Sequence, residues 1–295
     1  MKRSVPPLIL LLLFLVPAVP AAAAISARFS FGPAIIGTGD LAAGIQGNND
    51  VSARLYGPSL SGGLKAPGLG FEPSGEIVLH LGSRWGIGFG SGFSFFSGEG
   101  ELAYAVGDVT VKEHLLTRLT AVPLQLNIHF FIPLSGRLSI DAWAGPGLYL
   151  TRWTWDYTMT AGAQGMSGSD RFIFKAGRPA FGGQAGLAVG LKLSNALDLT
   201  IEVSGRYASA GGFSGDWTET GSGDFWSLAD SGQASAWAYD WMYDGKPFRQ
   251  LSFQETAPEG ESVKNARDAR IELTGLGVRL GFRIRLPFGR PAERP

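Results

Sequence analysis

The sequence has no cysteine, little charge and only three histidines, and each shortage excludes a class of protein or site. Without cysteine the chain has no disulfide, no thiolate metal site, no cysteine nucleophile and no lipid-modified N-terminal cysteine. Charged residues make up 17% of the chain, below the roughly 25% of typical soluble domains. Lysine plus arginine and aspartate plus glutamate balance at 25 each, so no basic field is available to attract nucleic acid.

The longest apolar run lies at the N-terminus. A lysine and an arginine precede the run 8–16, and a stretch rich in proline and alanine follows it. This order is typical of a secretory signal peptide, and we expect cleavage after Ala23 or Ala24. The alternative is a membrane anchor, but the run is too short to cross about 30 Å of hydrocarbon. We therefore predict an exported protein with a signal peptide at 1–24.

Glycine and alternating residues are abundant in the rest of the chain. There are 43 glycines, about twice the ordinary share. No stretch after the N-terminal run has the roughly 18 apolar residues of a membrane helix, whereas many segments alternate between apolar and polar residues. In one of them, Leu126 and Ile128 share a face, and Asn127 and His129 share the opposite face. We predict strands at 28–35, 76–84, 85–95, 121–132, 138–150, 181–193, 197–206 and 275–288.

The links between these segments alternate between short and long. Tight turns are expected at 82–84, 135–137 and 194–196, and every other link is long. This alternation is typical of outer-membrane barrels, which have short periplasmic turns and long outer loops. Glycine and opposed charges on the polar faces suit the narrow interior of a barrel with eight strands. A soluble sandwich, with its apolar faces inward, is the alternative.

We therefore predict an all-β fold, an eight-stranded antiparallel up-and-down transmembrane β-barrel with long extracellular loops. The barrel is expected at 25–288, followed by a C-terminal tail at 289–295. It must close, because hydrocarbon offers no water to the unpaired backbone groups of a sheet edge. A ten-stranded barrel is an alternative, although 215–232 is a poor spanning strand. The outer loops are expected at 37–74, 97–112, 157–179 and 208–268.

Five segments, spread in order over the mature chain, carry patterns beyond simple alternation. They are 121–126, 141–147, 181–186, 199–203 and 277–288. Together they resemble the small outer-membrane β-barrel domains related to the OmpA transmembrane domain, the OmpW type and the opacity-type surface proteins. Such barrels often end at an aromatic residue that assembly machinery reads; Phe288 has that place here, although further residues follow it. The resemblance implies an outer-membrane location and contact with the barrel-assembly machinery.

The polar faces of the predicted strands carry charges of both signs. We expect them to form ion pairs that fill and close the barrel interior, because buried charges need partners. An ion-selective pore or a gate is the alternative, although eight strands leave little room for water. The expected lumen charges are Glu76, Arg84, Asp141, Lys192, Asp198, Glu202, Arg206, Arg279, Arg283 and Arg285.

The histidines bear on catalysis, since hydrolases of the outer membrane need a histidine beside a serine nucleophile or a carboxylate. His80 and His129 belong to predicted lumen faces, and His114 lies near the outer rim beside Glu113. No spacing matches a hydrolase signature. The acidic residues of the last loop also lack the order of a calcium loop. We therefore predict no catalytic residue, no metal site and no cofactor.

Aromatic residues occur at strand ends and in the last predicted loop. We expect Trp85, Trp153 and Trp155 at the membrane interfaces. An Asp-Gly pair at 244–245 predicts an extracellular hairpin in the last loop. We expect the aromatic residues of that loop to pack the hairpin on itself; binding of sugar or of a partner protein is the alternative, since large exposed aromatic patches usually have a use. These residues are Trp217, Trp226, Trp237, Tyr239, Trp241 and Tyr243.

Three classes of function follow from these patterns. The first is a non-catalytic outer-membrane β-barrel, monomeric, with a structural or surface-interaction role through its extracellular loops. Its expected partners are outer-membrane lipid, lipopolysaccharide and an extracellular protein or glycan, and no nucleic acid. The second class is a narrow channel for small solutes, and the third is an outer-membrane lipid-modifying enzyme. The predicted lumen charges and the lack of a catalytic spacing favour the first class.

Overall fold

The computed structural model describes residues 24–224 and 226–286, which form one antiparallel sheet of 17 strands and an α-helix. No helix within these residues is long and apolar enough to cross a membrane. The predicted signal peptide, except Ala24, and the predicted C-terminal tail lie outside the described residues.

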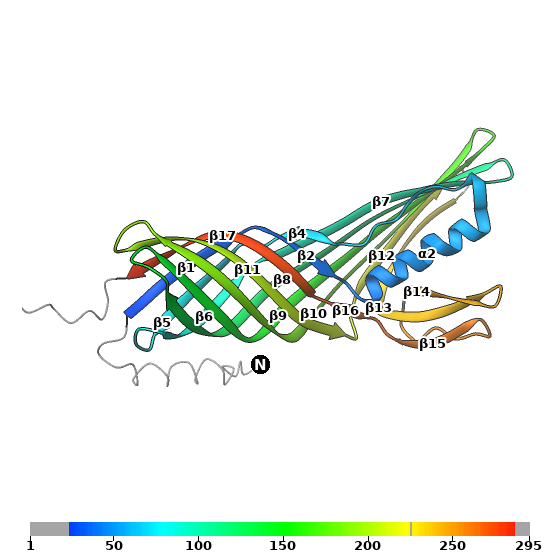
Figure 1. Ribbon diagram of the computed structural model, residues 1–295. Helices are drawn as coiled ribbons and strands as arrows, with labels where there is room; N and C mark the ends of the chain where they lie inside the picture. Colours follow the sequence, from blue (N-terminus) through cyan, green and yellow to red (C-terminus); the bar gives the residue numbers. More distant parts are fainter. Residues whose placement is uncertain (1–23, 225, 287–295) are drawn as a thin grey trace, which may run out of the picture.

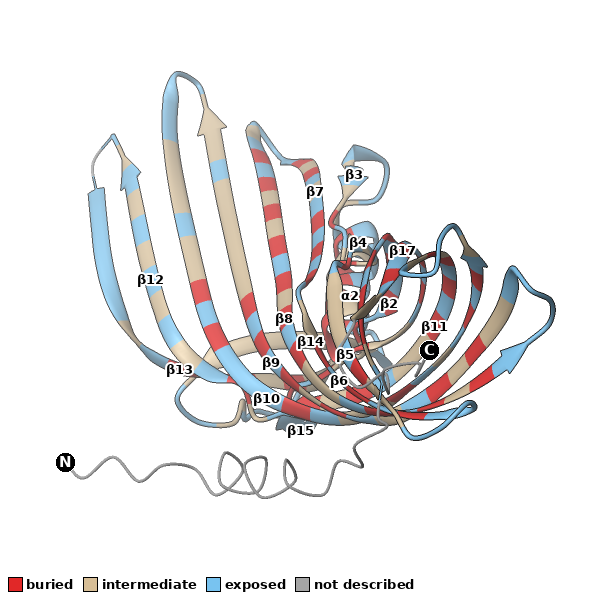
Figure 2. Ribbon diagram, turned by 90° about the vertical axis from the view of Figure 1, so that its left-hand side faces the viewer, coloured by how far each residue is buried: buried red, intermediate tan, exposed pale blue. Residues whose placement is uncertain are grey.

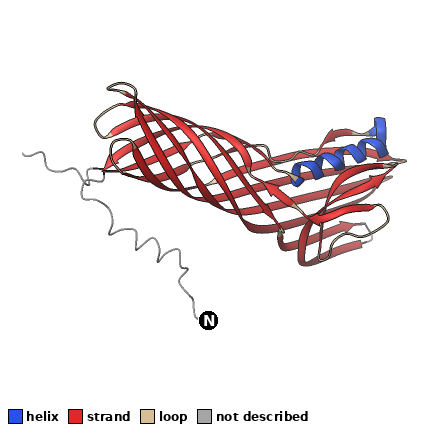
Figure 3. Ribbon diagram, turned by 60° about the horizontal axis from the view of Figure 1, so that its bottom comes forward, coloured by secondary structure: helices blue, strands red, loops and turns tan. Residues whose placement is uncertain are grey.

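Eight of the strands pair with one another in a closed ring (Figure 3). Around the ring the order is β1, β5, β6, β8, β9, β10, β11 and β17, and β17 pairs again with β1. Every pair is antiparallel, so the ring has no free edge. The strands are β1 (Ala24–Phe31), β5 (Ser74–His80), β6 (Trp85–Gly92), β8 (Val109–Pro133), β9 (Leu138–Ala163), β10 (Met166–Lys192), β11 (Leu197–Gly211) and β17 (Thr274–Leu286).

The prediction of an eight-stranded barrel is wrong for the sheet as a whole, which has 17 strands and continues beyond the ring. Strands β8, β9 and β10 have 25, 26 and 27 residues. A tilted membrane crossing needs only about 10 residues. The further strands are β2 (Pro33–Gly37), β3 (Ser61–Gly63), β4 (Leu69–Phe71), β7 (Ser94–Val106), β12 (Ser214–Gly223), β13 (Trp226–Tyr243), β14 (Lys246–Gln254), β15 (Val263–Asp268) and β16 (Arg270–Glu272).

The prediction of long outer loops is therefore also wrong. Stretches 97–112, 157–179 and 208–268 are mostly strands, and 37–74 contains α2 (Asp40–Tyr56) and the 3-10 helix η2 (Gly57–Ser59). Strands β12 and β13 pair with each other, and β12 also pairs with β10, but neither is a member of the ring. The expectation of a hairpin near residue 244 is met by β13 and β14.

The ring has an apolar exterior and a polar interior, with the faces that the alternation predicts. On β8, Leu126 and Ile128 are 51% and 60% exposed, whereas Asn127 and His129 are 2% and 0% exposed. Buried and exposed bands alternate in the same way along β8, β10 and β11 (Figure 2). Apolar side chains that face outward around a closed ring fit a hydrocarbon surrounding.

Beyond the ring, residues 94–121, 151–180 and 213–243 form a broad continuation that we call the distal sheet. Next to the ring its inward side chains are mostly apolar, in contrast to the charged interior of the ring. Trp153 is fully buried, with its ring centroid 5.6 Å from that of Phe174 and 5.9 Å from that of Phe213. The expectation that Trp153 lies at a membrane interface is therefore wrong, since it is at the centre of an apolar core.

Helix α2 and the β13–β14 hairpin cover this core. The helix lies between β7 and β14 (Figure 1), and its main contacts are with β14. A Cβ atom on Gly47 would lie 1.8 Å from the carbonyl oxygen of Arg249, so only glycine allows this approach. Asp40, at the start of the helix, accepts hydrogen bonds from Arg267 at 2.6 and 2.8 Å. The helix and the hairpin thus cover the part of the distal sheet that adjoins the ring.

Candidate functional site

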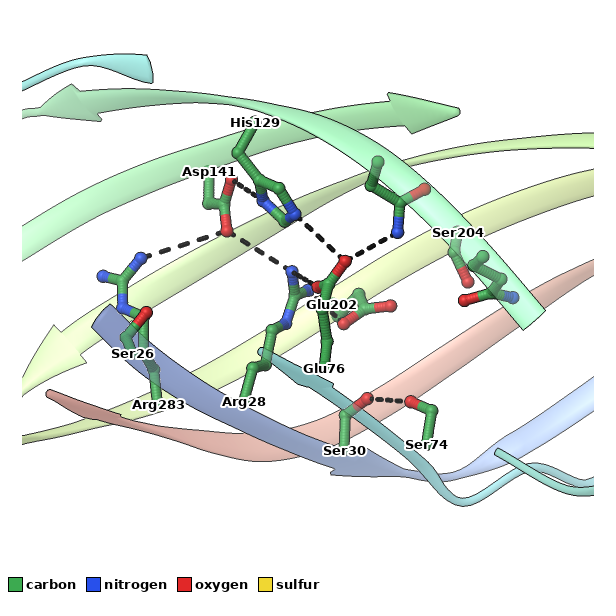
Figure 4. Close-up of polar contacts among 12 residues, drawn as sticks. Ser26, Arg28, Ser30, Ser74, Glu76, His129, Asp141, Glu202, Ser204 and Arg283 are labelled. Carbon is green, nitrogen blue, oxygen red and sulfur yellow. Dashed lines mark hydrogen bonds and ion pairs between the residues drawn. The ribbon is translucent and has the colours of Figure 1, made fainter. Parts of the chain in front are cut away.

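The ring interior contains a connected cluster of charged side chains (Figure 4). Arg28, on β1, lies at its centre and is 4% exposed. Its guanidinium forms an ion pair with Glu202 and lies 3.3 Å from the Asp141 carboxylate and 3.8 Å from that of Glu76. One arginine therefore joins carboxylates from β5, β9 and β11 across the lumen.

His129 connects two of these carboxylates on the opposite wall. Its Nδ1 lies 3.0 Å from Asp141 Oδ1, and its Nε2 lies 3.1 Å from Glu76 Oε1. Because an ionised carboxylate only accepts, both contacts are hydrogen bonds if the imidazole carries both ring protons. A Cβ atom on Gly88 would lie 2.3 Å from Glu76 Oε1, so the glycine makes room for this group. The histidine therefore joins two carboxylates of the cluster.

The cluster continues toward the short turns through the arginines of β17. Arg279 forms an ion pair with Glu202, and Arg283 lies 3.9 Å from Asp141. Asp198 accepts hydrogen bonds of 2.7 Å from both Arg283 and Arg285. These arginines come from one strand because alternate residues of a strand share a face. Together with Arg28 they cross-link β1, β9, β11 and β17 inside the ring.

A separate ion pair lies at the junction between the ring and the distal sheet. Arg206 pairs with Glu72, and its Nε donates to the carbonyl oxygen of Leu273 at 2.9 Å. Its guanidinium also lies 5.3 Å from the centre of the Phe96 ring, which belongs to the apolar core. This pair ends the polar interior, and the apolar core begins directly above it.

The structure gathers most of the predicted lumen charges but not all of them. Glu76, Asp141, Asp198, Glu202, Arg279, Arg283 and Arg285 belong to the cluster, and Arg206 pairs separately. Arg84 is exposed at a turn, and Lys192 forms no ion pair within the described part of the chain. Sequence reasoning missed Arg28, His129 and Glu72 as partners. Arg28 lies on the polar face of the first predicted strand, 28–35, so the alternation of that strand could have placed it in the lumen.

The lumen has little free space among these side chains. One cavity of about 20 Å³ lies between Glu72, Ser94 and Arg206, and another of about 20 Å³ lies beside Arg28 and Glu76. A volume of this size holds roughly one water molecule. The charged cluster therefore fills the ring interior rather than lining an open passage.

The other two histidines form no ion pair or hydrogen bond with this cluster in the described part of the chain. His80 shares a hydrogen bond of 2.9 Å with the Ser26 hydroxyl, but Ser26 is fully buried and offers no access to a substrate. His114 lies 3.1 Å from Glu99 on the outside of the distal sheet. Within residues 24–224 and 226–286, no group of three or more potential ligands could hold a metal ion.

The six aromatic residues that are candidates for ligand binding do not form one patch. Trp217 and Trp226 share the inward face, where the Trp217 ring stacks at 6.0 Å on Phe172 and Trp226 is 47% exposed. The other four, Trp237, Tyr239, Trp241 and Tyr243, lie on the opposite face of β13 from the buried Ala236 and Ala238. Trp237 Nε1 donates to the carbonyl oxygen of Gln254 at 3.1 Å, so this residue also packs the hairpin on itself.

No family model matches the chain, and no curated protein matches it. Among solved structures, a major outer membrane protein from Thermus thermophilus aligns with 90% of this chain and 100% of its own, at 12% identity and a TM-score of 0.31. The RagAB peptide transporter covers 89% of this chain and 40% of its own, at 12% identity and a TM-score of 0.16. A Pseudomonas aeruginosa FadL homologue covers 89% of both chains, at 7% identity and a TM-score of 0.15. At these identities and TM-scores, the similarity gives no indication of function.

Proposed function

We propose that the chain is a non-catalytic outer-membrane β-barrel protein whose closed ring anchors the distal sheet at the cell surface. The observation that carries this proposal is the pairing of an apolar exterior with a charged, cross-linked interior in the ring. In water such an exterior would associate, because large exposed apolar patches are rare on soluble monomers. In a bilayer it meets the acyl chains of lipids, and the closed ring leaves none of its strands with an unpaired edge.

The lumen is proposed to be closed to solutes. Arg28 and its carboxylates bridge strands on several sides of the ring, and separating them would leave buried charges without partners. The small cavities beside the cluster support the same conclusion. We expect no steady single-channel conductance after reconstitution into planar lipid bilayers. A stable conductance of uniform size in every insertion would contradict a closed lumen.

The orientation in the membrane is proposed from the lengths of the connections. The ring ends on one side at short turns, and the distal sheet extends from the other side (Figure 1). Short turns face the periplasm in outer-membrane barrels, which places the distal sheet outside the cell. The expected partners are outer-membrane lipid, lipopolysaccharide and the barrel-assembly machinery, with a monomeric barrel.

The absence of cysteine makes this orientation simple to test. In intact cells, a membrane-impermeant maleimide should label Ser222→Cys, at the end of the distal sheet, but not Ser135→Cys, at a short turn. The unmodified chain is the control for background, since it contains no cysteine. Labelling of Ser135→Cys but not of Ser222→Cys would overturn the proposed orientation. A purified ring that is intact should also migrate differently in SDS before and after boiling.

A further inference from the structure

The inward face of the distal sheet is covered only in part. Near the ring, its side chains are buried beneath α2 and the β13–β14 hairpin. Toward the strand ends the cover is lost, and Met159 and Trp217 are half-buried while Trp226 and Leu228 are exposed. An apolar and aromatic face therefore remains open to water at the end farthest from the ring.

Charges are sorted between the two faces of this sheet. The inward face holds Glu113, Asp170, Glu219 and Asp230, whose direct neighbours across the strands include one another and the inward-facing Met159 and Phe172. Over 109–121, 151–176, 214–223 and 226–238, which are all described, no cation shares this face. The cations of these segments lie on the opposite face; they are Lys112, His114, Arg118, Arg152, Arg171 and Lys175.

The elements that face this surface do not neutralise it. Arg249 of the hairpin lies 3.1 Å from Asp240, and Arg54 of α2 lies 3.1 Å from Asp244. Glu113 accepts a hydrogen bond of 2.9 Å from the Tyr104 hydroxyl, which gives it a partner within the fold. The carboxylates farther from the ring are thus left without a cation on this face.

A hollow of about 300 Å³ opens on the same face between the ends of β8, β9, β10 and β13. Met159 and Met166 contribute apolar walls, Asp170 and Asp224 contribute carboxylates, and Trp226 borders the opening. We call this feature the acidic hollow. A Cβ atom on Gly221 or Gly223 would lie 2.3 Å from the Trp226 ring, so the two glycines make room for the flat indole.

Asp170 is the carboxylate most clearly without a partner in the acidic hollow. Its Oδ1 is shielded from solvent and accepts no hydrogen bond from the described residues. Burial and the negative charge of Asp170 raise the pKa of the neighbouring Glu219 above its ordinary value. Two carboxylates that repel each other in this way are stabilised by a cation between them.

We propose that the acidic hollow binds the basic side chains, above all arginine, of a peptide segment in a partner protein. This inference rests on the proposed function, which places the hollow outside the cell. A guanidinium forms paired hydrogen bonds with carboxylates and stacks on an indole, so Asp170 and Trp226 in the hollow, with Glu219 beside Asp170, supply both kinds of contact. The alkyl stem of the arginine lies against Met159 and Met166.

Binding is measured with the purified full-length barrel in detergent, titrated with hexa-arginine while tryptophan fluorescence is recorded. We expect saturable binding at low salt that weakens as salt rises, because screening reduces attraction between charges. Binding should also weaken as the pH falls and Glu219 takes up a proton. Asp170→Asn/Glu219→Gln should raise the Kd about tenfold, which corresponds to about 1.4 kcal/mol.

The matched control is Glu101→Gln/Asp216→Asn, which removes the same charge from the outward face of the distal sheet. This control should bind hexa-arginine as the unmodified chain does, and both variants should keep their heat-dependent mobility in SDS. An equal loss of affinity in the control would overturn the site, as would equal binding of hexaglutamate. Tighter binding of spermine than of hexa-arginine would overturn the assignment to a peptide. Failure of the cell-labelling experiment, by contrast, would overturn the orientation and leave these affinities unchanged.

Discussion

The ring and the distal sheet are built by the same long strands, yet their polarity is opposite. On β8 the inward side chain is His129 in the ring and Leu115 in the distal sheet. The outward side chains are Ile128 in the ring and Arg118 in the distal sheet. The backbone keeps one phase throughout, since odd-numbered residues face inward in both regions. The surroundings of the strand, rather than its geometry, therefore decide which face is apolar.

Different interactions stabilise the distal sheet and the ring. In the distal sheet, apolar side chains leave water and pack closely around Trp153, as in a soluble protein. In the ring, which we propose lies in lipid, the burial of apolar groups brings no such gain, and backbone pairing and the lumen ion pairs hold the strands together. The Arg206–Glu72 pair lies at the boundary between the charged interior of the ring and the apolar core of the distal sheet.

The largest expected effect comes from removing the centre of the distal core. Trp153→Ala should lower the free energy of unfolding of the distal sheet by about 4 kcal/mol, because it leaves a large cavity among Phe174, Phe213 and their neighbours. The ring should keep its heat-dependent mobility in SDS. Urea unfolding of the barrel in lipid vesicles measures the effect. Trp226→Ala, at an exposed tryptophan, should change stability by less than about 1 kcal/mol and is the control.

The second effect concerns the lumen. Arg28→Ala should destabilise the ring by about 3 kcal/mol, since it leaves Glu202, Asp141 and Glu76 buried with less positive charge. The temperature at which the SDS mobility shifts should fall. Arg84→Ala removes an arginine that is exposed at a turn and should leave that temperature unchanged. An equal fall in both variants would show that the cluster does not hold the ring together.

The third effect compares the two outward faces of β8. Leu126→Arg should cost about 2 kcal/mol in lipid vesicles, because it puts a charge against the acyl chains. Thr110→Arg, on the outward face of the distal sheet, should change stability by less than about 0.5 kcal/mol, because its side chain remains in water. Equal costs at the two positions would contradict the difference in surroundings.

The smallest expected effect comes from breaking the exposed ion pair between Arg171 and Asp156 on the distal sheet. Hydrogen bonds from Arg171 lower the pKa of Asp156, so this pair stabilises the fold above the ordinary aspartate pKa. The contribution is lost as the pH falls through the lowered pKa. Because the pair is screened by water, Arg171→Gln should cost only about 0.5 kcal/mol at neutral pH. The difference from the unmodified chain should vanish in strong acid.

The alternation in the sequence predicts the strands of the ring well, because a strand with two chemically different faces alternates strictly. It indicates every strand of the ring, and most of the inward charges with them. The same alternation does not predict the strands of the distal sheet. Its segments 157–179 and 208–235 are rich in glycine, serine and threonine, which also fill loops, and they form strands because long neighbours pair with them. Helix α2 contains glycines that weaken helix propensity, and its contact with β14 compensates for them.

The sequence likewise predicts only part of each candidate site. The phase of each stripe indicates that Asp141 and Arg283 face the lumen, but not that Arg28 joins Asp141 across 113 positions of sequence. For the acidic hollow, the sequence indicates the aromatic residue Trp226 without the neighbouring carboxylates Asp170 and Glu219. Those neighbours come together only because β10 and β12 pair beyond the ring.

The most direct test of the change in surroundings compares two outward positions on the same strand. Leu126→Cys and Arg118→Cys, each labelled with a polarity-sensitive fluorophore, are reconstituted into lipid vesicles that contain nitroxide-labelled acyl chains. Emission from position 126 should be blue and quenched by the nitroxide, whereas emission from position 118 should be red and quenched by iodide in the water. Equal quenching of both positions by iodide would mean that the ring does not lie in lipid, and would contradict the proposed membrane anchor.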